Sequence, residues 1–278
     1  MKKFFTVLAV LCTALTMSYA QDNISVGEIN GTSNFLTLKD HKVYYEVFGQ
    51  GDPLLILHGN GGSTKGKHRL LSKLTDKYQV ILMDNRCHGQ SGCPEGELTY
   101  LKMADDTNAL MQHLGHEKYY IWGHSDGGIV SLILGYKYPA QIDRMLVTGA
   151  NIRPDTTALQ NRLVELMGIY PQIPDPMMSK HIELMVKHPN IPISKIKEIN
   201  VPVLLMVGDR DAVKLEHTVE IFKALPKANL CIMPGTTHFI DSEKPDQLIY
   251  WLNEFKKPFK APSTVAIMEE YAKSLSGH

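Results

Sequence analysis

The chain has 278 residues, with 29 basic and 29 acidic side chains and a formal net charge of zero. This length is sufficient for one large hydrophobic core, and α/β folds of this size commonly form a single domain. The balanced charge gives no indication of a nucleic-acid-binding protein or of one that binds anionic membranes.

The first twenty residues have the pattern of an export signal. Residues 2–3 are lysines, residues 4–15 are apolar apart from two threonines, and residues 18–20 form a small-x-small cleavage site. The apolar run is shorter than the ~20 residues that span a bilayer. We therefore expect a cleaved signal peptide over residues 1–20 and a mature chain that starts near Gln21. The mature protein would be periplasmic or secreted, without stable insertion in the membrane.

Three cysteines remain after removal of the signal, at positions 87, 93 and 231. In an oxidising compartment they can form at most one pair, and Cys87 and Cys93 are close enough in sequence to do so. Three unpaired thiols are the alternative, and the sequence leaves both open.

Predicted strands and helices alternate along the mature chain. Apolar and β-branched runs predict strands at residues 35–38, 42–48, 53–57, 78–83, 119–122, 144–148, 201–207 and 228–233. Apolar spacing predicts helices at about 64–77, 99–114, 129–138, 215–225 and 245–257. This alternation predicts an α/β domain over residues 21–257, with a mostly parallel sheet covered on both faces. Residues 258–278 form a C-terminal tail in which we expect one short helix.

The alternation is interrupted at about residues 152–200, after the sixth predicted strand. This segment has six prolines and two expected helices, at about 155–168 and 177–187. We interpret it as a short helical lid inserted in the domain. The apolar residues best suited to roof a pocket, or else to form only the core of the lid, are Leu163, Leu166, Met167, Met177, Met178 and Met185.

The segment at residues 119–138 predicts a strand that turns sharply into a helix. Residues 119–122 are aromatic or β-branched, and an apolar run begins at Ile129. Between them, residues 123–127 read Gly-His-Ser-Asp-Gly, the G-x-S-x-G pattern of a nucleophile elbow. Glycine at both ends of this pattern leaves room for the turn because it has no Cβ atom. We therefore expect Ser125 to lie above the sheet edge, at the positive end of the helix dipole.

A serine hydroxyl needs a neighbouring base that is oriented by a carboxylate. In α/β sheets such groups gather at the carboxyl ends of the strands. Of the twelve histidines only His238 comes directly after the final predicted strand, so we expect it to accept the proton of Ser125. Asp211 and Asp209 follow the preceding strand, and we favour Asp211 because the later residue projects further past the sheet edge. Asp155 is a third candidate.

Two backbone N–H groups are expected to form an oxyanion hole. One belongs to Asp126, directly after the nucleophile, and the other to Asn60 in the glycine-rich loop that follows the strand at 53–57. A phosphate-binding loop is the alternative interpretation of these glycines. It is disfavoured because neither Gly-Lys-Ser/Thr nor G-x-G-x-x-G follows the strand.

These motifs, in this order, resemble those of the α/β-hydrolase superfamily over residues 35–257. The motifs that carry the resemblance are His58-Gly59, Asp84-x-Arg86-x-His88-Gly89-x-Ser91, Gly123-x-Ser125-x-Gly127, Gly208-Asp209-x-Asp211 and His238. Cys87 stands where the family's loop has a glycine, so the local backbone there is in question. The resemblance implies an α/β-hydrolase fold with a catalytic triad.

Within the superfamily, Trp122 with the elbow motif, together with residues 137–139 and 148–151, resembles the biphenyl-hydrolase-like branch that includes valacyclovir hydrolase. The lid does not obviously match that branch, so the substrate is not carried over. Asp126 has two interpretations. It is an acidic residue in the first turn of a helix that points away from the site, or it binds an ammonium group of the substrate and so offsets its repulsion of the oxyanion.

We therefore expect an exported serine hydrolase that cleaves a small carboxylic ester, with an aminoacyl ester as one candidate, through an acyl-enzyme. A carbon–carbon bond hydrolase or a perhydrolase would use the same triad. A non-catalytic small-molecule-binding protein on a hydrolase scaffold is an alternative of another class. No metal-ligand spacing occurs in the sequence, and the expected chemistry needs no cofactor and no nucleic-acid partner.

Overall fold

The computed structural model describes residues 29, 31–257 and 262–276. The predicted signal peptide at residues 1–20 lies outside the described residues.

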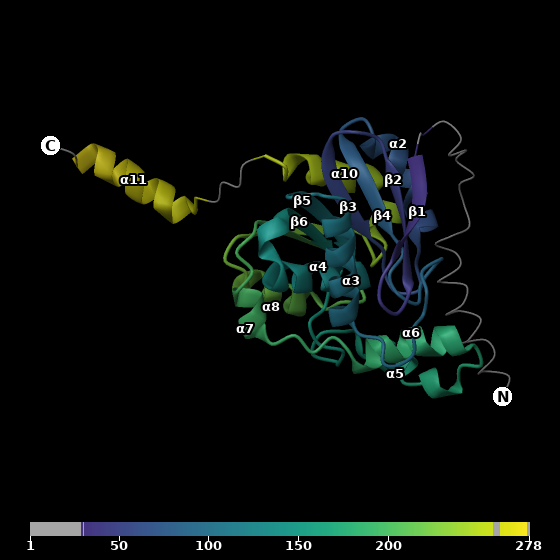
Figure 1. The fold of residues 1–278 in the computed structure, drawn as a ribbon. Coiled ribbons are helices and arrows are strands. Elements are labelled where there is room, and N and C mark those ends of the chain that lie inside the picture. The colour runs from purple at the N-terminus through teal and green to yellow at the C-terminus, as the bar shows by residue number, and fades with distance from the viewer. Residues whose placement is uncertain (1–28, 30, 258–261, 277–278) are drawn as a thin grey trace.

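One sheet of eight strands forms the centre of the described chain (Figure 1). The strands are β1 (Gly31–Thr37), β2 (Lys42–Phe48), β3 (Asp52–Leu57), β4 (Tyr78–Met83), β5 (Tyr119–His124), β6 (Ile142–Thr148), β7 (Val203–Gly208) and β8 (Ala228–Met233). Their spatial order is β1-β2-β4-β3-β5-β6-β7-β8. β1 and β2 pair antiparallel, as do β2 and β4, while every other neighbouring pair is parallel. The predicted mostly parallel sheet is confirmed.

Helices cover both faces of the sheet. α3 (Tyr100–His113), α4 (Asp126–Lys137), α7 (Ile193–Lys197) and α8 (Leu215–Ala224) pack on one face. The 3₁₀ helix η2 (Thr64–Leu70), α2 (Leu71–Leu74) and α10 (Pro245–Glu254) pack on the other. Two short elements, η3 (Pro139–Gln141) and α9 (Ile240–Glu243), precede β6 and α10.

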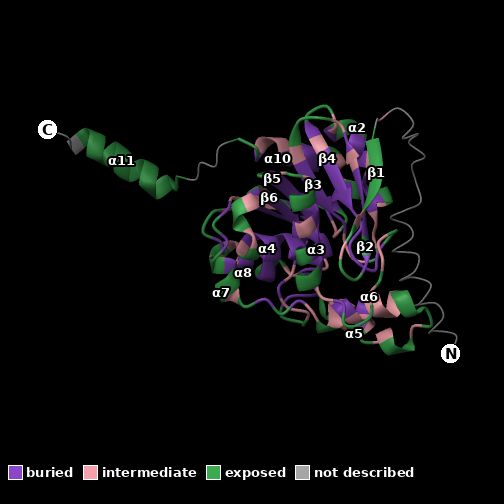
Figure 2. Ribbon diagram, viewed as in Figure 1, coloured by how far each residue is buried: buried purple, intermediate pink, exposed green. Residues whose placement is uncertain are grey.

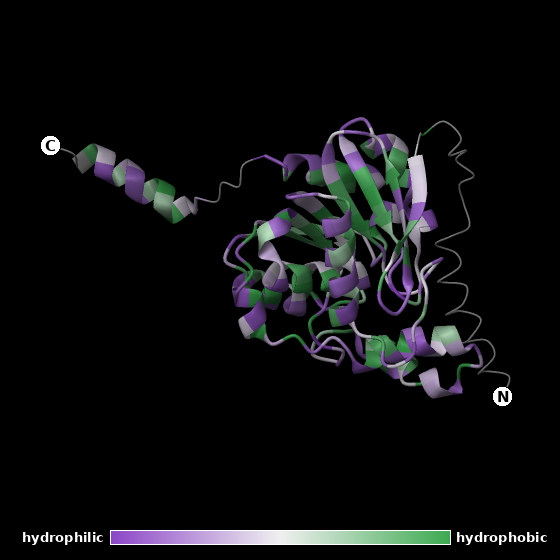
Figure 3. Ribbon diagram, in the orientation of Figure 1, coloured by the Kyte–Doolittle hydropathy of each residue, from purple (hydrophilic) through white to green (hydrophobic). Residues whose placement is uncertain are grey.

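The alternation of side chains along β3 explains this arrangement. Leu55 and Leu57 belong to the core on one face, and Leu54 and Ile56 to the core on the other. Because both faces are buried, the strand is a continuous apolar run rather than an alternating one. The central strands are accordingly buried in Figure 2 and hydrophobic in Figure 3.

The segment between β6 and β7 contains α5 (Asn161–Met167), η4 (Tyr170–Gln172), α6 (Pro176–Lys187) and α7. Its first helix starts later than the predicted 155–168. Leu159 instead forms a bridge with Val213, and the Gln160 N–H donates to the Ala212 carbonyl, so this stretch is tied to the loop after β7. The two helices have a small core of their own, which includes Met167 and Ile182.

Two other expectations differ in detail from the structure. The helix expected at 64–77 is a 3₁₀ helix followed by a single α-helical turn, and Gly66 within it weakens any continuous α-helix. The expected tail helix corresponds to α11 (Thr264–Ser276), whose described side chains are exposed (Figure 2).

Candidate active site

Ser125 occupies a strained turn between β5 and α4. Its backbone has φ 54° and ψ −116°, outside the regions that residues other than glycine ordinarily adopt. A Cβ atom on Gly123 would lie 2.2 Å from the Gly127 carbonyl oxygen, and one on Gly127 would lie 2.3 Å from the Leu57 carbonyl oxygen. Both glycines are therefore required for this turn.

The structure brings Ser125, His238 and Asp211 into one chain of hydrogen bonds. The Ser125 hydroxyl donates to His238 Nε2 at 2.9 Å, and His238 Nδ1 donates to Asp211 Oδ1 at 2.7 Å. Burial alone would raise the pKa of Asp211, but His238 and the Val213 N–H lower it below its ordinary value. Burial alone would lower the pKa of His238, but the Asp211 carboxylate raises it. The arrangement therefore stabilises a proton on the imidazole.

The other two carboxylate candidates make different contacts. Asp209 accepts the N–H groups of Gly235 and Thr236 at 3.0 and 3.1 Å, and so shapes the turn that leads to the histidine. Asp155 is exposed and accepts the Thr157 N–H at 2.8 Å. Neither carboxylate is bonded to the imidazole.

Asn60 lies in the loop after β3, close to the nucleophile. A Cβ atom on Gly59 would lie 3.1 Å from the Ser125 Cβ atom, so this loop approaches the serine closely. The His58 ring fixes this loop by two hydrogen bonds. Its Nδ1 donates to the Gly59 carbonyl at 2.7 Å, and its Nε2 accepts the Asn85 N–H at 3.1 Å. Burial lowers the pKa of His58 to about 4, so this ring is neutral. The N–H of Asp126 is at the first turn of α4, where N–H groups lack helical partners.

The Asp126 side chain is buried and lines the same pocket as Ser125, rather than pointing away from it. Its carboxylate accepts hydrogen bonds from the Tyr100 hydroxyl at 2.8 Å and from Asn60 Nδ2 at 2.9 Å. Burial raises the pKa of Asp126 to about 6, although both hydrogen bonds act to lower it. Tyr100, at the start of α3, is a residue that sequence reasoning missed.

A pocket of about 420 Å³ lies above Ser125. Its lining includes the apolar lid residues Leu163, Leu166, Met167, Ile182 and Met185. Met177 is instead 39% exposed, and Met178 packs in the core of the lid. The pocket thus has an apolar roof made from four of the six predicted residues and from Ile182.

The lid is bonded to the loops around the site. His181 on α6 contacts the Cys87 carbonyl through Nε2 at 2.7 Å, and its ring stacks on His88 with centroids 4.0 Å apart. Asn60 Nδ2 donates to the His181 carbonyl at 3.1 Å. The same amide that holds Asp126 therefore also holds the lid.

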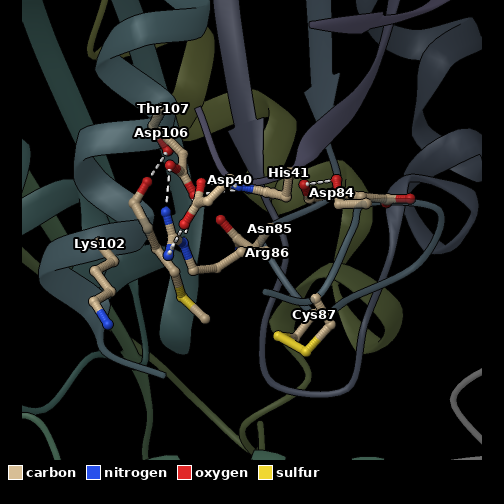
Figure 4. A network of polar contacts seen from close by, with 12 residues as sticks. Asp40, His41, Asp84, Asn85, Arg86, Cys87, Lys102, Asp106 and Thr107 are labelled. Carbon is tan, nitrogen blue, oxygen red and sulfur yellow. Dashed lines mark hydrogen bonds and ion pairs between the residues drawn. A yellow bond between two sulfur atoms is a disulfide. The ribbon is translucent and has the colours of Figure 1, made fainter. Parts of the chain in front are cut away.

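Cys87, which stands where the family's loop has a glycine, adopts the backbone conformation that a glycine would favour. Cys87 has φ 62°, in the left-handed region that favours glycine, and it forms a disulfide with Cys93. The sequence left open either one disulfide or three unpaired thiols. The structure has the disulfide, and Cys231 is free. Figure 4 shows how Arg86 is held in the same loop, by two bonds of 2.6 Å to Asp106.

Other kinds of site are not found in the part of the chain that the structure describes. It contains no group of three or more His, Cys, Asp or Glu side chains arranged to hold a metal ion. It also contains no helix that is long and apolar enough to cross a membrane.

Comparison with known proteins agrees with this fold. A model of the α/β hydrolase fold family matches residues 52–170. A putative carbamate hydrolase, RutD, of Agrobacterium fabrum is 23% identical and covers 78% of this chain and 98% of its own. An uncharacterized protein of Mycobacterium tuberculosis is 29% identical over 119 residues, which are 43% of this chain and only 35% of that protein.

Solved structures show the same fold at low sequence identity. The 2-hydroxy-6-oxo-6-phenylhexa-2,4-dienoate hydrolase of Rhodococcus sp. strain RHA1 superimposes with a TM-score of 0.71 at 19% identity, covering 83% of this chain and all of that one. Est816, an N-acyl homoserine lactone degrading enzyme, gives a TM-score of 0.67 at 20% identity, over 80% of this chain and 100% of its own. The chain therefore has the α/β-hydrolase fold, and residues 52–170 match the model of that family. Its fold and its hydrolase-named relatives support the prediction of a hydrolase.

Proposed function

We propose that this chain is an exported serine hydrolase that cleaves small carboxylic esters through an acyl-enzyme on Ser125. The observation that carries the proposal is the continuous chain of hydrogen bonds from Ser125 through His238 to Asp211, with links of 2.9 and 2.7 Å. Both lengths lie within the reach that proton transfer requires.

The proposed reaction has two halves. In the first, Ser125 Oγ attacks the ester carbonyl carbon as His238 Nε2 takes the hydroxyl proton, and the Asp211 carboxylate stabilises the imidazolium. The N–H groups of Asn60 and Asp126 stabilise the oxyanion, each such donor contributing on the order of 3 kcal/mol. The bond to the leaving alkoxide then breaks, and His238 gives it the proton.

In the second half, His238 takes a proton from water as the water oxygen attacks the acyl carbon. The acyl bond to Ser125 breaks, the carboxylic acid leaves, and the proton returns to the serine oxygen. The apolar lid residues suit the acyl chain, because burial of its methylene groups against them is favourable. The same contacts exclude water from the acyl-enzyme.

Reaction with a fluorophosphonate probe tests the proposal. We expect the wild-type protein to be labelled and to hydrolyse 4-nitrophenyl acetate, and both properties to be lost in Ser125→Ala. A wild-type protein that is folded but neither labelled nor active would instead be a binding protein on a hydrolase scaffold.

Asp126 supports a preference for esters that carry an amine near the carbonyl. An ionised carboxylate about 7 Å from the oxyanion would oppose it by roughly 2 kcal/mol at an effective dielectric constant near 20. A substrate ammonium beside Asp126 would cancel this repulsion. Because the pKa of Asp126 is raised to about 6, the preference should strengthen as the pH rises through that value.

This preference is measured with aminoacyl esters and their des-amino analogues, in the wild type and in Asp126→Asn. We expect the wild type to favour the amine by about thirtyfold in kcat/KM, as roughly 2 kcal/mol would give, and the variant to lose that preference. Equal selectivity in the two proteins would remove Asp126 from substrate recognition.

Export belongs to the same proposal and is supported by the signal-like pattern of residues 1–20. N-terminal sequencing of the protein purified after expression of the whole chain should find a start near Gln21. A start at Met1 would contradict export by cleavage.

A further inference from the structure

Part of the pocket wall is charged, and the proposed mechanism does not use these charges. Lys67 and Arg69 on η2 and Asp241 on α9 line the same pocket as Ser125 and His238. Lys67 is only 6% exposed and Asp241 only 4%, so the pair lies in the interior rather than on the surface.

Both cations share a single carboxylate oxygen. Lys67 Nζ lies 2.6 Å from Asp241 Oδ2, and Arg69 Nη2 lies 2.7 Å from the same atom. The ammonium also lies 4.8 Å from the centre of the Trp122 ring. Arg69 donates further to the Gly66 carbonyl and to Ser242, but its Nε is buried and has no hydrogen-bond partner among the described residues.

This part of the pocket therefore has one more positive than negative charge. His124 does not change the balance, because burial, helped by Lys67, lowers its pKa to about 3 and leaves the ring neutral. The remaining pocket acid, Asp126, is bonded to Tyr100 and Asn60 rather than to either cation. The Arg69 side chain is 23% exposed, so water solvates part of this excess charge, and an anionic group on a ligand in the pocket would compensate the remainder.

The position of the cluster indicates which part of the substrate would carry the anion. His238 must give a proton to the leaving alkoxide, so the leaving group lies beside its imidazole. Asp241 follows His238 by three residues, and both line the pocket, as does Phe239 between them. The acyl group, by contrast, has the apolar lid residues to contact.

We propose that Lys67 and Arg69 form an anion subsite that binds a carboxylate on the leaving group of the substrate. This inference rests on the proposed ester hydrolysis and names its substrate class as esters of carboxylate-bearing alcohols or phenols. Arg69 uses three of its five N–H groups on Gly66, Asp241 and Ser242. Its Nε is closed to solvent, so one Nη1 hydrogen remains to donate to a carboxylate beside the Lys67 ammonium.

A purely structural role for the cluster is the alternative, since it links η2 to α9. Lys73 provides a matched control, because it forms an exposed ion pair of 2.7 Å with Asp246 between α2 and α10 and does not line the pocket. Lys73→Met thus removes a link between the adjoining elements α2 and α10 without touching the proposed subsite.

The kinetic experiment compares 4-carboxyphenyl acetate with 4-carbamoylphenyl acetate, which differ in charge but little in size. After correction for their alkaline hydrolysis rates, we expect the wild type to favour the carboxylate by about tenfold or more in kcat/KM, as for a charged hydrogen bond. Arg69→Met should lower this ratio towards one, while Lys73→Met should keep it. An unchanged ratio in Arg69→Met, or a wild-type ratio near one, would overturn the inference.

A binding experiment separates this inference from the proposed catalysis. Titration calorimetry of Ser125→Ala should show 4-hydroxybenzoate binding about tenfold more tightly than 4-hydroxybenzamide, and this difference should vanish in Ser125→Ala/Arg69→Met. Equal binding of the two phenols overturns the subsite even if the wild type hydrolyses esters. A retained carboxylate preference, in a protein whose wild type is not labelled by fluorophosphonate, would uphold the subsite and reject the proposed reaction.

Discussion

Burial of Asp126 links the stability of the protein to pH. Its pKa is raised from 3.8 to about 6 in the folded state, because burial disfavours the charged form more than Asn60 and Tyr100 favour it. The folded protein therefore binds this proton more tightly than the unfolded chain does. The stability that the group contributes is complete below its unfolded pKa and is lost as the pH rises through the folded value. The difference between the ordinary value of 3.8 and the folded value of about 6 corresponds to roughly 3 kcal/mol.

Asp126→Asn removes this titrating group. Between pH 4 and pH 7 we expect the free energy of unfolding of the wild type to fall by roughly 2–3 kcal/mol relative to that of the variant. Urea denaturation at several pH values measures the difference, with the exposed Asp246→Asn as a control that should follow the wild type. Parallel pH profiles for Asp126→Asn and the wild type would contradict the burial of this charge.

Individual residues were predictable from the sequence where one local rule governs them. Ser125 is flanked by glycines, and His238 follows the last strand, so their placement at the sheet edge follows from the order of the elements. Lys67 and Asp241 are 174 residues apart in the sequence. Each is a charged residue of a type that is ordinarily exposed to solvent. Their burial depends on tertiary packing, for which no local pattern exists.

At the scale of the elements, the loop after β4 has Cys87 where the family has a glycine, and a disulfide to Cys93 restrains it. Cys87 holds a left-handed backbone that costs about 1 kcal/mol or more for a residue with a side chain. The bond to Cys93 closes a short loop, which restricts the unfolded chain. The loop in turn bears the carbonyl that contacts His181 of the lid.

Two double variants separate these effects. Cys87→Ala/Cys93→Ala should lose roughly 2 kcal/mol of stability through the loop entropy alone. Cys87→Gly/Cys93→Ala should be more stable than the alanine variant by about 1 kcal/mol, because glycine adopts the left-handed backbone without strain. Urea denaturation under non-reducing conditions measures both. Equal stability of the two variants would show that the backbone relaxes when the disulfide is absent.

The elements themselves were predicted best where burial is two-sided. The central strands are unbroken apolar runs because helices cover both faces, and this pattern is readable without a structure. The start of the lid was predicted less well. Residues 155–160 have a helical pattern, but the bridge from Leu159 to Val213 and the bond from Gln160 to Ala212 override it.

At the scale of the whole molecule, the sheet order explains how distant residues meet. β5, β6, β7 and β8 are parallel neighbours, so the loops after β5, β7 and β8 emerge at the same edge. These three loops carry Ser125, Asp211 and His238. The lid between β6 and β7 covers this edge with apolar side chains, while α9 and η2 add the charged wall.

A comparison of variants at Asp211 and Asp209 tests the proposed catalytic triad most directly. Both carboxylates follow β7, and only Asp211 is bonded to the imidazole. The rate of fluorophosphonate labelling of Ser125 should fall by about 10³–10⁴-fold in Asp211→Asn, in which the histidine loses its orienting carboxylate. In Asp209→Asn the rate should stay within about tenfold of the wild type, since one oxygen still accepts a turn N–H. Wild-type labelling in Asp211→Asn, or its loss in Asp209→Asn alone, would contradict the assigned triad.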